Sequence, residues 1–228
     1  MPGLFITSTG TGIGKTFVAA GLARFLRAQG RKVDALKPVI SGFDPRLVGE
    51  SDTGVLLSAL GRPSHEAEIE RVSPWRFAAP LSPDMAAAKE KRAIDFEALV
   101  QFSQTGLATS ADAVLIEGVG GIMVPLDRSH TGLDWMKALD IPLLLVAGSY
   151  LGSISHTLSA VAVLRQHRCK LAMIVVSETE GSHVDLDETA GAISRFARDV
   201  GIVALPRKMN AADAEGAFGF IADSCGLL

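Results

Sequence analysis

One segment near the start of the chain has the residues of a phosphate-binding loop. Residues 7–16 read TSTGTGIGKT and lie between a short apolar run and a helical pattern. Glycines let backbone N–H groups turn toward a phosphate, Lys15 adds charge for the phosphate oxygens, and the Thr16 hydroxyl can ligate Mg²⁺. The N-terminus of the helix adds partial positive charge. We therefore predict a phosphate loop, although Thr9 stands where the strict pattern GxxxxGK[ST] has its first glycine.

A second lysine follows the next apolar run. Lys37 opens the segment KPVISG, residues 37–42. Ligands of open α/β sheets bind beyond the carboxyl ends of the strands, which would place Lys37 beside the phosphate loop. Two lysines suit a highly charged site, such as a triphosphate with a carboxylated substrate. From this segment alone, Lys37 is equally compatible with a solvated strand end, and Ser41 with ordinary turn chemistry.

Two acidic residues are candidates for binding Mg²⁺. Glu117 ends the apolar run of AVLIEGVGG, residues 113–121, and a carboxylate at a strand tip beside a phosphate loop can hold the metal. The alternative for Glu117 is a local salt bridge. Asp52, in GESDTG, is a second candidate ligand, and it could equally be the N-cap of a following helix.

A fourth segment of small residues follows the apolar run 142–147. Residues 148–156 read GSYLGSISH, and small residues at a helix start leave N–H groups free for a carboxylate or phosphate. Plain serine N-capping explains the same pattern. We interpret His156, a lone histidine on a helix, as packed or exposed and not as catalytic. No two histidines have ligand spacing, so nothing supports a histidine metal site.

The elements that must position these residues alternate between strands and helices. Near-continuous apolar runs are typical of parallel strands buried on both faces. The alternation predicts a doubly wound α/β fold, with a mostly parallel sheet flanked by helices. Residues 41–93 hold five of the ten prolines, and we interpret them as an insertion over the carboxyl edge of the sheet. The expected strands are 4–7, 33–37, 113–117, 142–147, 171–176 and 202–205, and the expected helices are 15–29, 95–108, 153–167 and 186–199.

Composition places the chain among globular proteins. Its 228 residues, 48% apolar and 21% charged, fit one large domain, which we take as residues 1–228. A net charge of −3 argues against a nucleic-acid-coating surface. Cys169 and Cys225 lie far apart without CxxC spacing, which favours a reducing cytoplasm over a disulfide or zinc framework. The apolar run 141–148 is too short for a spanning helix, and the N-terminus does not resemble a secretory signal, so we expect a cytoplasmic protein without a membrane partner.

Taken together and in order, the motifs resemble the dethiobiotin synthetase family of the P-loop NTPase superfamily over nearly the whole chain. The resemblance implies a P-loop NTPase-like fold and an ATP- and Mg²⁺-dependent ligase. The implied substrates are 7,8-diaminononanoate and CO₂. One amine captures CO₂ as a carbamate, ATP phosphorylates it, and the second amine closes the cyclic urea. The motifs are STGTGIGKT (8–16), KPVISG (37–42), SD (51–52), SPWRFAAPLSP (73–83), IEGVGG (116–121) and LGSISH (151–156).

The same resemblance implies roles for individual residues and a two-fold homodimer with composite sites. Lys37, Lys15 and Thr11 are then catalytic, and Ser41 contacts the substrate. The substrate's carboxylate tail is received by the other subunit, through Leu151, Gly152, Ser153, Ile154 and Ser155. The implied ATP-binding residues are Gly12, Ile13, Gly14, Lys15, Thr16, Phe17, Asp52, Glu117, Gly118, Val119, Gly120, Ser177, Glu178, Pro206, Arg207, Lys208 and Asp213, and the implied Mg²⁺ ligands are Thr16, Asp52 and Glu117.

Several positions depart from the family pattern. Ser8 and Gly10 replace the family's loop Gly and Asp, and Ser155 stands where the family usually has Asn. Asp84 replaces the His of the usual SPH, a change without a physical account. Ser177 replaces an Asn that reads the adenine edge, and one hydroxyl cannot make the paired contacts of an amide. The last change predicts a weaker preference for ATP over other nucleoside triphosphates.

Two other functions fit parts of the sequence. A glutamine-fed amide ligase of cofactor synthesis would need an attached amidotransferase domain with a catalytic cysteine, for which the chain is too short. A partitioning-type ATPase switch commonly carries an extra lysine early in the phosphate loop, and residues 9–13 contain none.

Overall fold

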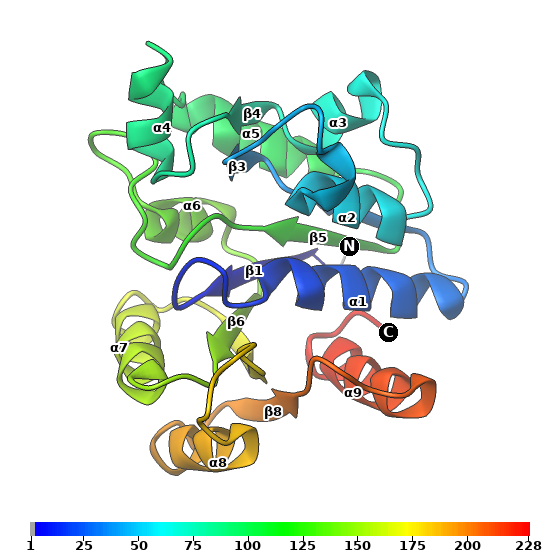
Figure 1. Ribbon diagram of the computed structural model, residues 1–228, viewed down its shortest axis with the longest axis vertical. Coiled ribbons are helices and arrows are strands. Elements are labelled where there is room, and N and C mark those ends of the chain that lie inside the picture. Colours follow the sequence, from blue (N-terminus) through cyan, green and yellow to red (C-terminus); the bar gives the residue numbers. More distant parts are fainter. Residues whose placement is uncertain (1–2) are drawn as a thin grey trace.

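A six-stranded parallel sheet forms the centre of the computed structural model, which describes residues 3–228 (Figure 1). The strand order is β2-β5-β1-β6-β7-β8, and every neighbouring pair is parallel. The expected strands are confirmed, with each end within one residue of its predicted position. Their bounds are β1 Gly3–Ser8, β2 Val33–Leu36, β5 Ala113–Glu117, β6 Leu143–Gly148, β7 Leu171–Ser177 and β8 Gly201–Leu205.

Helices cover both faces of this sheet, so the doubly wound prediction is confirmed. Successive strand residues point to opposite faces. In β1, Leu4 and Ile6 pack with α1, whereas Phe5 packs on the other face, edge-on to Trp135 of α6. One layer holds α1 Lys15–Ala28, α2 Asp52–Ala59 and α9 Ala211–Ser224, and the other holds α5 Phe96–Leu107, α6 Gly132–Leu139, α7 Ser153–Gln166 and α8 Leu186–Phe196.

The proline-rich insertion is more regular than its composition predicts. After Pro38 ends β2, the chain forms β3 Val39–Ser41, which pairs in parallel with β4 Trp75–Phe77. A small core of its own, including Ile40 and Leu57, ties this sheet to α2. The insertion therefore holds Ser41 and Asp52 rigidly beside the main sheet. Its remaining elements are the short 3₁₀ helix η1 Val48–Glu50, α3 Glu66–Val72 and α4 Pro83–Lys89.

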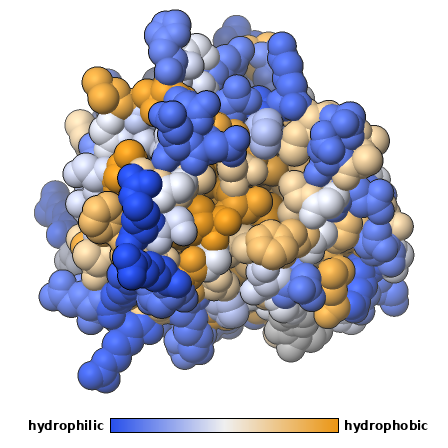
Figure 2. Space-filling view, turned by 90° about the horizontal axis from the view of Figure 1, so that it is seen from below, coloured by the Kyte–Doolittle hydropathy of each residue, from blue (hydrophilic) through white to orange (hydrophobic). Residues whose placement is uncertain are grey.

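The helices α6 and α9 are absent from the sequence-based assignment. In α9, Phe218 is buried against α1, while Phe220 is exposed. Seen from below, apolar side chains gather in the middle of the face and hydrophilic ones surround them (Figure 2). Within residues 3–228, no helix combines the length and the apolar character needed to cross a bilayer.

Candidate active site

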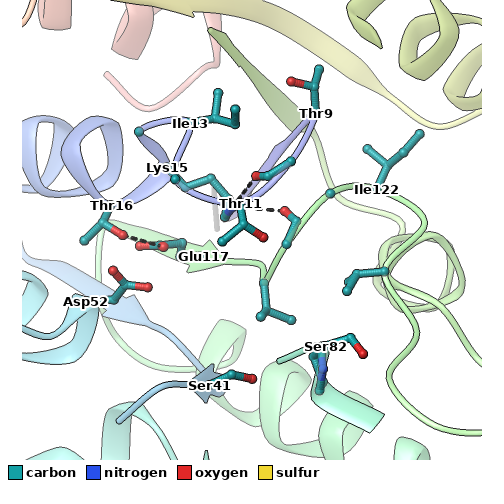
Figure 3. A pocket seen from close by; sticks show the side chains of 18 of the residues that line it. Thr9, Thr11, Ile13, Lys15, Thr16, Ser41, Asp52, Ser82, Glu117 and Ile122 are labelled. Carbon is teal, nitrogen blue, oxygen red and sulfur yellow. Dashed lines mark hydrogen bonds between the residues drawn. The ribbon is translucent and has the colours of Figure 1, made fainter. Parts of the chain in front are cut away.

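A cavity of about 1150 Å³ opens at the carboxyl ends of β1, β2 and β5 (Figure 3). This is where open parallel sheets bind their ligands. The structure brings the phosphate loop, Lys37, Ser41, Asp52 and Glu117 together there. The full lining is Thr9, Gly10, Thr11, Gly12, Ile13, Gly14, Lys15, Thr16, Phe17, Lys37, Ile40, Ser41, Asp52, Pro80, Leu81, Ser82, Pro83, Glu117, Val119, Gly120, Gly121, Ile122, Met123, Val124, His156, Ser159, Ala160, Val163 and Arg207.

The phosphate loop has the backbone geometry that an anion site requires. Gly12 and Gly14 have φ values of 72° and 117°, in the left-handed region that favours glycine. Gly14 is the N-cap of α1, where no side chain caps the helix and no acidic residue occupies the first turn. The free N–H groups and the positive end of the helix dipole therefore remain available to a phosphate. A nucleoside triphosphate fits this loop.

Lys15 is buried beside the loop and is held by three oxygen atoms. Its Nζ donates to Ser8 Oγ at 2.9 Å, to Gly120 O at 2.9 Å and to Gly10 O at 3.1 Å. Burial, followed by the nearby positive charge of Lys37, lowers the pKa of Lys15 to about 8. A negatively charged ligand in the cavity would therefore strengthen the charged form of this lysine.

Lys37 is only 2% exposed, so its interpretation as a solvated strand end is wrong. Its Nζ lies 2.7 Å from Glu117 Oε1 and 3.1 Å from Asp52 Oδ2, and it donates to Gly118 O at 2.7 Å. Burial acts to lower the pKa of Lys37, but the two carboxylates outweigh it and raise the pKa above its usual value. The site therefore holds a fixed positive charge between two acidic groups.

The acidic residues fit a Mg²⁺ site. Glu117 is 1% exposed, and its Oε2 has no hydrogen-bond partner within the described structure. Thr16 Oγ1 donates to Glu117 Oε1 at 2.7 Å. Ser51, not Asp52, is the N-cap of α2, so the capping alternative for Asp52 is wrong. Two carboxylates and one hydroxyl are ligands that Mg²⁺ accepts alongside water and phosphate oxygens. The salt-bridge alternative for Glu117 also holds, because Glu117 pairs with Lys37.

Some of the implied ATP-binding residues line the cavity, and others do not. Phe17 and Arg207 line the cavity, and the Arg207 guanidinium carbon lies 5.1 Å from the Phe17 ring centroid. Glu178 braces this arginine through its carbonyl oxygen and its carboxylate, at 2.9 and 2.8 Å. Ser177 is fully buried next to Gly14, with no partner for its Oγ among the described residues. The implied ATP-binding residues that do not line the cavity are Gly118, Ser177, Glu178, Pro206, Lys208 and Asp213.

Asp213 lies in the first turn of α9. Its backbone N–H donates to Asn210 Oδ1 at 2.8 Å, and its carboxylate accepts from Asn210 Nδ2 at 2.7 Å. These bonds cap the helix. The structure therefore gives this carboxylate a local role outside the cavity.

Residues 151–155 do not line the cavity of their own chain. Leu151 is 92% exposed, Gly152 is the N-cap of α7, and Ser153 Oγ is buried without a partner in the described part of the chain. Instead, one face of α7 lines the cavity. That face, His156, Ser159, Ala160 and Val163, was missed, although its spacing follows the period of a helix.

An apolar wall was also missed by the sequence analysis. Ile122, Met123 and Val124, in the loop after β5, line the cavity together with residues 80–83 of the insertion. Glycines 118, 120 and 121 were the available signal, because such a loop brings backbone close to a ligand. Ser41, at the end of β3, lines the same cavity, and its buried Oγ has no hydrogen-bond partner among residues 3–228.

Comparison with known proteins agrees with this arrangement. The family model described as "AAA domain" matches residues 2–208. The ATP-dependent dethiobiotin synthetase BioD of Methylobacterium nodulans is 50% identical over 203 residues, covering 86% of this chain and 90% of the relative. The chain belongs to the dethiobiotin synthetase family. The BioD of Acidiphilium cryptum is 47% identical, over 86% of this chain and 88% of the relative. Family membership makes this protein an ATP-dependent ligase and accounts for the phosphate loop.

Solved structures share the fold of the dethiobiotin synthetase chain at low sequence identity. The Aquifex aeolicus MinC:MinD cell division complex contains a chain that is 14% identical with a TM-score of 0.57, covering 99% of this chain and 95% of that one. The Pyrococcus furiosus cell division ATPase MinD gives 16% identity and a TM-score of 0.55, with 99% of both chains covered. These similarities confirm the P-loop NTPase-like fold and say nothing further of function.

Proposed function

We propose that this protein catalyses the ATP- and Mg²⁺-dependent carboxylation and ring closure of 7,8-diaminononanoate with CO₂, giving dethiobiotin. The observation that carries the proposal is the meeting of two buried lysines, Lys15 and Lys37, with Ser41 in one cavity. A carbamate and a triphosphate are both anionic, and a site that joins them needs fixed positive charge placed between them. Family membership supplies the reaction class.

The chemistry requires positioning and charge stabilisation more than a protein nucleophile. One amine forms an N–C bond with CO₂ and loses a proton, which gives a carbamate. The carbamate oxygen takes the γ-phosphoryl group of ATP, and ADP leaves. The second amine then attacks the carbonyl carbon, loses a proton and expels phosphate. Lys37 stabilises the carbamate and the developing phosphoryl charge, with Thr11 and Lys15 beside it. Fixed charges in a water-excluded site stabilise a transition state more strongly than the same charges do in water.

The metal site is part of the proposal. Thr16, Asp52 and Glu117 would hold Mg²⁺, which supplies charge neutralisation for the triphosphate oxygens when bound. Glu117 Oε2, which has no hydrogen-bond partner in the part of the chain that the structure describes, supports this assignment. Lys37 shares both carboxylates, so it fixes their orientation toward the phosphate loop. The remaining implied ATP contacts, including Ser177, Pro206, Lys208 and Asp213, stay proposals.

The substrate tail is proposed to bind in a homodimer. Residues 151–155 lie outside the cavity of their own chain, and Leu151 is almost fully exposed. A two-fold dimer would carry this helix start to the cavity of the partner subunit. Free N–H groups at the start of α7 suit a carboxylate. The apolar wall formed by Ile122, Met123 and Val124 suits the methylene chain.

The two other functions have less support. Cys225 is buried, and burial raises its pKa to about 12, which makes it a poor nucleophile for an amidotransferase. Burial also raises the pKa of Cys169. A partitioning ATPase has only the fold resemblance in its favour.

Direct assay tests the proposal. The folded protein is incubated with diaminononanoate, bicarbonate and Mg-ATP, and dethiobiotin is sought by mass spectrometry. We expect product that depends on all four components. Folded protein that yields no dethiobiotin would contradict the proposal, and nucleotide-dependent dimerisation without turnover would favour the ATPase switch. Rates with ATP, GTP and CTP in the same assay test the weaker base preference predicted from Ser177.

A further inference from the structure

Ser8, the last residue of β1, lies at the junction between the phosphate loop and the loop that follows β5. It is fully buried. Its hydroxyl lies within hydrogen-bond distance of two backbone carbonyls, Gly10 O at 2.5 Å and Gly120 O at 3.0 Å, and accepts from Lys15 Nζ at 2.9 Å. Gly10 belongs to the phosphate loop, whereas Gly120 lies two residues before the apolar wall. Ser8 therefore contacts both sides of the cavity.

We call residues 118–124 the wall segment. Both lysines of the cavity donate to its backbone, Lys37 to Gly118 O and Lys15 to Gly120 O. At its other end, Ile122, Met123 and Val124 line the cavity. The position of the wall segment is thus set by the same ammonium groups that would have to serve the anionic ligands.

Ser8 and Lys15 share their acceptors. The ammonium group of Lys15 donates to Ser8 Oγ and to the carbonyls of Gly10 and Gly120. If Lys15 turns toward a triphosphate, the carbonyls of Gly10 and Gly120 lose the hydrogen bonds that its ammonium group donates. The contact of Ser8 Oγ with Gly120 O is buried, whereas its contact with Gly10 O is partly buried. An unpaired buried carbonyl is the more costly of the two, so the single proton of Ser8 would go to Gly120.

We propose that Ser8 is a positioning residue, whose hydroxyl keeps the wall segment bonded to the phosphate loop through Gly120 when Lys15 turns to the triphosphate. Without this hydroxyl, nucleotide binding would release Gly120 and loosen the apolar wall. Ser8 thereby lets one loop bind nucleotide while the adjoining wall stays in place for the second substrate. The inference takes the identity of the second substrate from the proposed function. The binding of a nucleotide does not depend on that proposal.

Hydrogen exchange measures this role without turnover. Amide exchange of the wall segment is compared in the wild type and in Ser8→Ala, each with and without a non-hydrolysable ATP analogue and Mg²⁺. In the wild type we expect the analogue to change exchange by less than about twofold. In Ser8→Ala we expect about tenfold faster exchange with the analogue and little change without it, because the cost of the unpaired carbonyl arises only when Lys15 has moved.

Steady-state kinetics with the diamine provide a second readout. Ser8→Ala should raise the KM for diaminononanoate about tenfold while kcat changes by less than about threefold. Ser8→Gly also removes the hydroxyl and should give the same results as Ser8→Ala. It replaces Ser8→Ala in both measurements if the alanine variant folds poorly. Thr109→Ala is the matched control. It also removes a hydroxyl, but one that, unlike that of Ser8, has no partner among the described residues, and it lies before the opposite end of β5. It should match the wild type in both measurements.

Two results would overturn the proposal. Equal exchange of the wall segment in wild type and Ser8→Ala with the analogue bound would mean that Gly120 needs no hydroxyl. Equally faster exchange with and without the analogue would mean that Ser8 is an ordinary structural residue. A wild type that binds the analogue but makes no dethiobiotin would contradict the proposed function and leave the exchange test decisive for Ser8.

Discussion

At the scale of single residues, the two lysines of the cavity differ in how their charge is compensated. Lys37 lies between the carboxylates of Glu117 and Asp52, whereas the described hydrogen-bond acceptors of Lys15 Nζ are neutral oxygen atoms. A lysine with neutral partners can exchange them for phosphate oxygens at little electrostatic cost. A lysine paired with two carboxylates, of which that of Glu117 is fully buried, is fixed in place. Lys15 therefore suits the role of a group that follows the phosphate, and Lys37 that of a stationary charge.

Replacing Lys37 tests both its catalytic role and its pairing. Lys37→Ala should lower kcat by about two to three orders of magnitude, because the carbamate loses its stabilising charge. It should also destabilise the protein by about 3 kcal/mol, since the Glu117 carboxylate is left buried beside Asp52 without a cation. Activity is measured as dethiobiotin formation, and stability by urea denaturation.

The double variant Lys37→Ala/Glu117→Gln separates the two effects. Neutralising Glu117 removes the unpaired charge, so we expect stability to recover while activity stays low. Wild-type turnover in Lys37→Ala would refute the catalytic role. A double variant no more stable than the single one would refute the electrostatic explanation.

At the scale of secondary structure, the sequence predicts the main sheet well and the insertion poorly. Strands such as 113–117 are buried on both faces, and their continuous apolar runs predict this burial. The helix α9 carries Gly216 and Gly219 and a weak apolar pattern, and tertiary packing of Phe218 on α1 stabilises it instead. Short helices such as α2, with eight residues, give too few turns for a periodic signal.

The same limit applies to the candidate site. Residues within one motif, such as Lys15 and Thr16, can be predicted because neighbours along the chain are also neighbours in the site. The burial of Lys37 between Asp52 and Glu117 depends on three segments meeting in space, and no local pattern carries it. The cavity face of α7 at His156 and Val163 is missed for the same reason.

Close packing of α1 on α9 gives a sharp test. A Cβ placed on Gly21 would lie within 2 Å of the Phe218 ring, at 1.9 Å from Cζ. Gly21→Ala should destabilise the protein by about 1–3 kcal/mol through overpacking. Gly191→Ala in α8, where a Cβ meets nothing within 4 Å, should stabilise it by about 0.5–1 kcal/mol. Thermal or urea unfolding measures both, and a loss in Gly21→Ala no greater than in Gly191→Ala would contradict the packing argument.

The start of α6 predicts a pH dependence of stability. Asp134 Oδ2 accepts the backbone N–H and the hydroxyl of Thr131, both at 2.9 Å, and the backbone bond is the first cause of a lowered pKa for this carboxyl. A carboxyl whose pKa is lowered by folding stabilises the protein at pH values above its unfolded-state pKa, about 3.9. This stability is lost as the pH falls through the folded-state pKa.

Asp134→Ala should therefore cost about 1 kcal/mol of unfolding free energy at pH 7 and progressively less below about pH 4. Urea denaturation across this range measures the difference from wild type. Asp187→Ala, at an exposed position in the first turn of α8, is the control. A difference that stays constant down to about pH 2.5 would show that the carboxylate charge is not responsible.

At the scale of the whole molecule, one chain contains the nucleotide side of the site but not the proposed tail side. The cavity takes its lining from the phosphate loop, the insertion, the wall segment and one face of α7. Residues 151–155, with exposed Leu151 and a Ser153 Oγ that has no partner within residues 3–228, lie outside that lining. A second copy of the chain would complete the tail side of the site and would also cover the exposed Leu151. Catalysis would then depend on assembly, although each chain folds its own nucleotide site.

Complementation between inactive variants tests this arrangement. Ser155→Asp puts a carboxylate where the substrate's own carboxylate is proposed to bind, and Lys37→Ala removes the catalytic charge. If the sites are composite, a heterodimer of the two carries one site with both residues intact. Random reassortment then makes half of the dimers mixed, so mixing equal amounts should restore up to about a quarter of wild-type activity. Mixing Lys37→Ala with Lys15→Ala should restore none, because those two lysines belong to one chain's cavity. Restoration in the second mixture, or its absence in the first with mixed dimers confirmed by native mass spectrometry, would contradict a site shared between subunits.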